Sequence, residues 1–118
     1  METSDQISAL VDAQLAQFED ARSAEYFREL RVTPRAEERP WDYGPPGQKY
    51  TCWIFFEHRE SNTCICYCSE GFGPKCPWGL LCLEGDEQWR SIGMDSGWFV
   101  RLEDAFRDSF AYEDLTKK

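Results

Sequence analysis

Apolar residues near the N-terminus recur at the spacing of a helix. Thr3, followed three residues later by Gln6, forms the capping-box pattern that begins a helix. At helical spacing, one face of the helix then carries a stripe of apolar side chains, Ile7, Leu10, Val11, Leu15 and Phe18. A stripe of this kind predicts a helix that packs one face against the core.

The helical pattern changes further along the chain. Phe27 and Leu30 fall off the first stripe, so the helix either bends near residues 21–24 or turns a second face to the core. Because the residue before a proline disfavours helical backbone, Pro34 predicts that the helix ends at about residues 31–32.

Residues 33–48 contain four of the six prolines of the chain, which predicts a connecting segment between the helix and the first strand. Trp41 and Tyr43 argue against free disorder, and we expect both rings to anchor the segment across the domain. The alternative is an exposed aromatic patch that binds a partner.

Residues 49–58 are aromatic or β-branched almost throughout and form the strongest predicted strand. A polar turn at residues 59–62 leads to a return strand at residues 63–69. A four-residue loop would pair Phe56 with Ile65, Ile54 with Tyr67, and Trp53 with Cys68. Both faces are apolar near the middle, so we expect this hairpin to be covered on both sides.

A loop rich in glycine and proline follows at residues 71–79, and we expect Phe72 and Trp78 to pin it by burial. After it, residues 80–83 and 88–94 predict a second hairpin.

Residues 102–112 have the spacing of a closing helix, with a frayed tail at residues 116–118. The chain of 118 residues is therefore predicted to be one α+β domain. Its elements would be an N-terminal helix, a four-stranded antiparallel sheet made of two hairpins, and a C-terminal helix.

The formal net charge is −9, from 22 acidic and 13 basic residues. This charge repels phosphate backbones and anionic lipid, so we expect neither nucleic acid nor membrane as a partner. It favours a basic protein partner through electrostatic steering. The N-terminus lacks the pattern of a signal peptide and no apolar run is long enough for a membrane span, so we expect a cytoplasmic protein.

The cysteines are the first candidates for chemistry. Cys64, Cys66 and Cys68 alternate along one strand and share a face, which offers a possible metal or thiol site. Their spacing differs from the C-x₂-C or C-x₄-C pairs of structural zinc sites. The single histidine, His58, would pair with Thr63 on the opposite face and lie at the surface. We therefore expect reduced, buried cysteines that bind no metal and form no disulfide.

The remaining motifs give no catalytic constellation. No cofactor-binding motif is found, and no base is placed beside a nucleophile, so the chain is not expected to be an enzyme. Carboxylates gather at turns, and with one nearby tryptophan they are the candidate partner-binding residues: Glu84, Asp86, Glu87, Trp89 and Asp95. A domain that binds a small ligand in a cleft between sheet and helix is a further alternative.

Four runs carry a resemblance to a known class: Gly71 to Pro74, Pro77 to Leu80, Gly93 to Phe99, and Leu102 to Phe106. With these runs, the region from Trp41 to Phe110 resembles small acidic bacterial proteins of the immunity type, the partners of polymorphic or contact-dependent toxins. The resemblance implies a non-enzymatic inhibitor that binds a cognate toxin domain. It transfers no functional residue, because such contacts differ from pair to pair.

Overall fold

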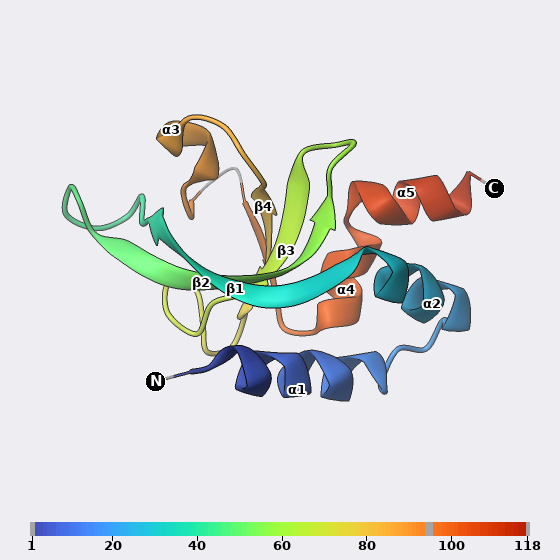
Figure 1. The fold of residues 1–118 in the computed structure, drawn as a ribbon. Coiled ribbons are helices and arrows are strands. Elements are labelled where there is room, and N and C mark those ends of the chain that lie inside the picture. The colour runs from blue at the N-terminus through green and yellow to red at the C-terminus, as the bar shows by residue number, and fades with distance from the viewer. Residues whose placement is uncertain (1, 94–95, 118) are drawn as a thin grey trace.

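A computed structural model describes residues 2–93 and 96–117, without the side chains of residues 87 and 88. Its elements in chain order are α1 (Ser4–Leu15), α2 (Ala21–Leu30), β1 (Arg31–Pro40), β2 (Lys49–His58), β3 (Thr63–Tyr67), β4 (Trp78–Cys82), α3 (Glu87–Arg90), β5 (Gly97–Phe99), α4 (Leu102–Arg107) and α5 (Phe110–Thr116). The five strands pair antiparallel in the order β1-β2-β3-β4-β5. Figure 1 shows α1 along one side of the long, curved strands β1 and β2, and α3 on the other side. The predicted α+β class is confirmed, but the sheet has five strands rather than four.

Two strands, β1 and β5, were not predicted, and β1 occupies most of the segment predicted to be a connection. Seven residue pairs join it to β2, from Arg31 opposite Phe56 to Pro40 opposite Lys49. The prolines are tolerated because β1 is an edge strand: Pro34 lies where the register shifts, and Pro40 is the last residue. Only residues 41–48 remain as the connecting loop.

The N-terminal helix is interrupted rather than bent. The capping box of Thr3 and Gln6 is present, and α1 ends at Leu15. A second helix begins after Asp20, whose carboxylate accepts a hydrogen bond from the backbone N–H of Arg22. The carboxylate of Glu103, which is 5% exposed, accepts further hydrogen bonds from the backbone N–H groups of Glu19 and Asp20. A side chain from α4 therefore stabilises the start of α2.

The central hairpin has the predicted turn but a shifted register. His58 lies opposite Thr63 and Phe56 opposite Ile65, as predicted. Beyond an irregularity at Phe55 the pairing is Ile54 with Cys66 and Trp53 with Tyr67, one residue away from the prediction. A β-bulge places one additional residue on a single strand. As a result, the consecutive rings of Phe55 and Phe56 both enter the core on the helical side of the sheet.

Both faces of the sheet are buried, which confirms the prediction from the apolar pattern. One face packs against α1, α2 and α4, with Phe27 and Phe106 among its fully buried side chains. The opposite face buries a second set: Cys52, Ile54, Cys64, Cys66, Cys68, Leu81, Leu83 and Ile92.

The prediction of a second hairpin at residues 80–83 and 88–94 is wrong. Strand β4 pairs with β5, and residues 87–90 form the short helix α3 instead of a strand. Gly79 permits the pairing with β5, because a Cβ at this position would lie 2.6 Å from the indole ring of Trp98. The residues predicted to end the strand at 94, and Asp95 after it, lie outside the described residues.

The loop between the two halves of the sheet follows its prediction in part. Trp78 is 3% exposed, as expected, but Phe72 is 39% exposed and does not pin the loop by burial. The C-terminal helix is also divided, since Ser109 begins a new helix, α5, by accepting a hydrogen bond from the N–H of Tyr112. This helix extends to Thr116, so most of the predicted frayed tail is helical or adjoins the helix. Among the described helices, none combines the length and the apolar character that a membrane crossing requires.

Candidate functional site

Five aromatic rings meet where the β1–β2 loop approaches the loop before β4. They are Trp41, Tyr43, Tyr50, Phe72 and Trp98, which we term the aromatic cluster. Trp41 lies at its centre, with ring centroids 5.1 Å from Tyr43, 5.5 Å from Tyr50 and 5.1 Å from Phe72. Tyr43 is 53% exposed, so the cluster is open to solvent on one side. Trp41 therefore anchors the loop as expected, whereas Tyr43, which was expected to be an anchor too, is exposed; binding of a partner at this patch stays a prediction.

The aromatic cluster adjoins the segment that contains α3. The backbone N–H of Asp42 donates to the carbonyl of Ile92, and the carboxylate of Asp42 accepts from the hydroxyl of Ser91. A Cβ at Gly93 would collide with that carboxylate, so glycine is required for this contact. These contacts join the β1–β2 loop to the end of α3, the short helix that follows the predicted acidic residues.

Arg39 fastens α3 to the sheet. Its side chain is fully buried, and its Nη1 donates to the carbonyls of Cys82 at 2.8 Å and Arg90 at 3.1 Å. Its Nε donates to Glu37 at 2.9 Å, and Arg90 donates to the same carboxylate at 2.7 Å. Arg35 also lies 3.4 Å from this carboxylate, so three guanidinium groups face Glu37. Burial alone would raise the pKa of the Glu37 carboxyl, but the three guanidinium groups bring it below the usual range. The sequence analysis missed Arg39 because it assigned this residue to a linker.

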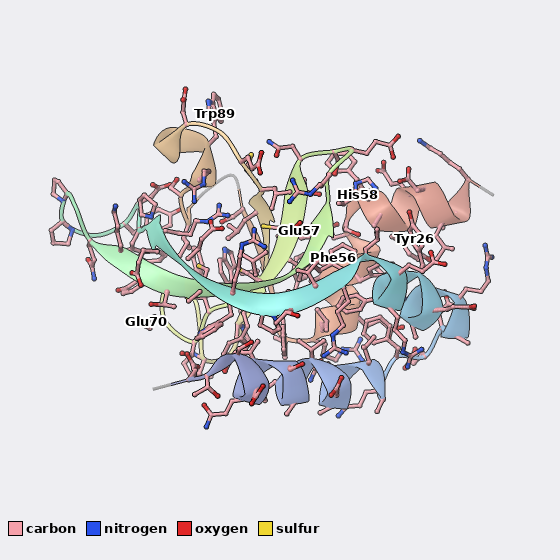
Figure 2. All side chains as sticks on the ribbon, in the orientation of Figure 1. Tyr26, Phe56, Glu57, His58, Glu70 and Trp89 are labelled. Carbon is pink, nitrogen blue, oxygen red and sulfur yellow. The ribbon has the colours of Figure 1, made fainter. Side chains whose placement is uncertain are left out.

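The predicted partner-binding residues are found around α3. Trp89 is 60% exposed, and Figure 2 places it on the helix. Glu84 is exposed and lies 3.4 Å from Arg59, and Asp86 is exposed at the N-cap of α3. Glu87 belongs to α3, but its side chain is outside the description, and Asp95 lies outside the described residues altogether. We term Glu84, Asp86 and Glu87 the acidic turn.

A second acidic surface was not predicted. A cleft of about 840 Å³ is lined by Glu2, Gln6, Ala36, Glu38, Thr51, Trp53, Ser69 and Glu70. We term it the acidic groove, because three carboxylates line it and no lysine or arginine of the described part of the chain does. Glu38 is held by the hydroxyl of Thr51, which donates to it at 2.6 Å across the β1–β2 pair. The groove is lined by Ala36 and Glu38 of β1. It was not predicted, because this segment was expected to be a linker.

A smaller cleft of about 330 Å³ lies between the sheet and the C-terminal helices. Its lining includes Ser61, Leu80, Cys82 and Asp108. If the protein binds a small ligand between sheet and helix, this cleft is the candidate site.

The cysteine row lies inside the sheet rather than at a site. All six cysteines are free; Cys52, Cys64, Cys66 and Cys68 are buried, and Cys76 and Cys82 are partly exposed. Burial raises the pKa of Cys64 to about 12. Burial also raises the pKa of Cys66, and hydrogen bonds among the thiols raise the pKa of Cys52 and Cys68. In the described structure these thiols do not gather three ligand atoms around one point.

We expect at most two cysteines of the native protein, Cys76 and Cys82, to react quickly with a thiol reagent. The four buried thiols are shielded, and the raised pKa leaves little of the reactive thiolate. Titration with a chromogenic disulfide under native conditions counts the fast-reacting thiols. The same titration in denaturant without reductant counts all free thiols. Six thiols should react after denaturation, and a smaller number would reveal a disulfide.

Comparisons with models of protein families, with curated proteins and with solved structures find no match to this chain.

Proposed function

We propose that the protein is a non-enzymatic binding protein of the immunity type, which binds a basic cognate toxin domain and neutralises it. The observation that carries this proposal is the half-exposed aromatic cluster, whose β1–β2 loop is joined to the end of α3, the helix that carries the exposed Trp89. Tryptophan and tyrosine are the residue types most enriched where interfaces gain their affinity.

Charge supports a basic partner. The chain carries a net charge of −9, and Glu84 and Asp86 are exposed beside Trp89. Carboxylates at the rim of an interface steer a basic partner during encounter, while aromatic side chains at its centre determine how long the complex persists. Blocking requires only that the bound protein covers the active site or substrate groove of the toxin.

The chemistry of the described residues agrees with a binding role. The buried thiols have raised pKa values, and the carboxylates of Glu84 and Asp86 in the acidic turn are exposed to solvent. The exposed aromatic rings are supported by a rigid sheet, since Trp41 and Trp98 pack against its buried cysteine-containing face. A preformed aromatic surface loses little entropy on binding.

Reversing the charge of the acidic turn in a triple variant, Glu84→Lys, Asp86→Lys and Glu87→Lys, is expected to slow association roughly tenfold or more at low salt. The melting temperature should hardly change, because exposed charges usually alter stability by less than about 0.5 kcal/mol. The measurement is co-expression with the product of the neighbouring open reading frame, followed by binding rates at low and high salt.

Two further triple variants carry the same change in net charge. Reversal of Glu19, Glu25 and Glu29, near or on α2, is the control and should leave protection intact. Reversal of Glu2, Glu38 and Glu70 tests the acidic groove as a rival interface. A larger effect in the groove would move the interface to that face, and equal effects in all three would show that only the overall charge matters. A neighbouring product that is harmless when expressed alone would contradict the immunity role.

A further inference from the structure

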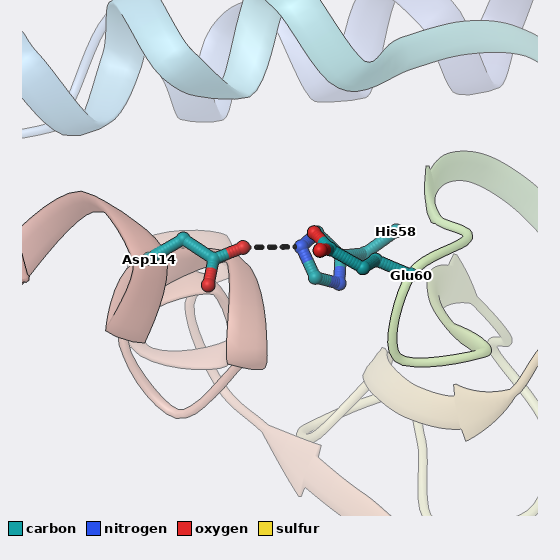
Figure 3. A group of neighbouring side chains, drawn as sticks. All are labelled: His58, Glu60 and Asp114. Atoms are coloured by element: carbon teal, nitrogen blue, oxygen red, sulfur yellow. Dashed lines mark hydrogen bonds and ion pairs between the residues drawn. The ribbon is translucent and has the colours of Figure 1, made fainter.

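His58 lies in a polar group that the proposed interface does not use. Although it ends a strand next to a turn, it is only 6% exposed, contrary to the expected surface position. Its Nε2 lies 2.7 Å from Oδ2 of Asp114 on α5 (Figure 3). Its Nδ1 lies 2.6 Å from Oγ of Ser61. Glu60 projects from the β2–β3 turn toward the same imidazole. One ligand atom from each of His58, Glu60 and Asp114 falls within 4.8 Å of the others.

The surroundings of this group are negative. The phenol of Tyr26 has a raised pKa, first because of burial and then because of the charges of Asp114, Glu29 and Glu60. Figure 2 shows Tyr26 and His58 on the same side of the molecule. Three carboxylates therefore act on this region, which favours a cation.

We propose that Nε2 of His58 and the carboxylates of Asp114 and Glu60 bind one divalent transition-metal ion of the Zn²⁺ class. Nitrogen and carboxylate oxygen are ligands of zinc at about 2.0–2.2 Å, and an imidazole ligand distinguishes zinc, cobalt and nickel from magnesium and calcium. Nε2 and Oδ2 face each other 2.7 Å apart, so an ion would replace their hydrogen bond after a small separation of the two side chains. Glu60 is exposed on a turn and supplies the third ligand by a small movement of its side chain.

The partner of the second ring nitrogen fits this assignment. A metal on Nε2 requires Nδ1 to carry the proton, and Oγ of Ser61 is placed to accept it. Ser61 in turn reaches the carbonyl of His58 at 3.3 Å and the hydroxyl of Thr63 at 2.7 Å. Histidine ligands of metals are commonly oriented by such a hydrogen bond. Ser61 is held by several partners within its own turn, which suits an orienting role better than that of a free nucleophile.

Metal binding would fix α5 to the central hairpin, since the ligands come from β2, the β2–β3 turn and α5. The test is titration of the full-length, reduced protein with Zn²⁺ and Co²⁺, monitored by calorimetry, thermal unfolding and the cobalt spectrum. We expect one site that raises the melting temperature, because the ion binds the folded state. Mg²⁺ and Ca²⁺ should not compete.

The decisive variant is Glu60→Gln, since Glu60 is exposed and its loss should leave the metal-free protein as stable as before. It should weaken Zn²⁺ binding about tenfold or more, while Glu113→Gln, at an exposed position next to Asp114 on α5, should have no effect. Equal affinity in Glu60→Gln and the parent would overturn the site, as would absence of Zn²⁺ binding. A thiolate-to-cobalt charge-transfer band that disappears in Cys82→Ser would assign the ion to cysteine instead. None of these outcomes depends on the toxin partner.

Discussion

Replacing Phe27 with alanine is expected to lower the free energy of unfolding by about 3–5 kcal/mol. The side chain is fully buried, and its ring centroid lies 4.8 Å from that of Phe56 and about 6 Å from those of Phe18, Phe55 and Phe106. The substitution removes the ring that joins α2 to both the sheet and α4. Since small domains are stable by only about 5–15 kcal/mol, denaturant unfolding should show a large loss or a protein that no longer folds.

The matched control is Phe110→Ala. Phe110 is 52% exposed, so the same change removes far less buried surface. We expect it to unfold close to the parent midpoint. Similar losses for the two variants would show that Phe27 does not have the central packing position that the structure assigns to it.

The substitution Arg39→Met is expected to destabilise the protein by a comparable amount, about 3–5 kcal/mol. Methionine fills much of the space but donates no hydrogen bond. Without the guanidinium group, the carbonyls of Cys82 and Arg90 lose a buried donor and Glu37 keeps only part of its pairing. An unsatisfied buried polar group costs about 1–3 kcal/mol, so several together produce a large effect.

Denaturant unfolding measures this loss, and hydrogen exchange of the α3 backbone shows where it acts. The amide of Trp89, which donates to the carbonyl of Asp86, should exchange faster in Arg39→Met. Arg59→Met is the control, because the Arg59 side chain is 66% exposed and its partner Glu57 keeps a second ion pair, with Arg35. A loss in Arg59→Met as large as that in Arg39→Met would contradict the argument from burial.

The sequence analysis succeeded where local chemistry decides the structure. The capping box of Thr3 and Gln6 began α1 as predicted, and the turn after His58 set the first pairs of the central hairpin. Apolar residues on both faces of that hairpin predicted a sheet covered on both sides. Each of these features depends on residues that are close in the chain, so it leaves a readable pattern.

The predictions are wrong where a residue distant in the chain changes the conformation that a segment prefers. The start of α2 is stabilised by Glu103, more than 80 residues later in the chain. The start of α4 is stabilised by the Gln14 side chain, which accepts a hydrogen bond from the backbone N–H of Leu102. Neither contact can be predicted from the residues near the helix that it stabilises. The bulge at Phe55 likewise follows from packing, because it brings two consecutive rings into one core.

The candidate sites divide in the same way. The sequence by itself determined that Glu84 and Asp86 lie in an exposed turn, because turn-forming residues with charge tend to lie at the surface. Trp89 was expected on a strand, and only the tertiary structure placed it on α3. Only the tertiary structure decided that a proline-rich segment is the edge strand β1, and with it the acidic groove and the buried Arg39. It also brought Asp114 within 2.7 Å of His58, 56 positions earlier in the chain. Local sequence fixes the conformations that a segment prefers, but burial and long-range hydrogen bonds choose among them, since their free energies exceed the small differences in local propensity.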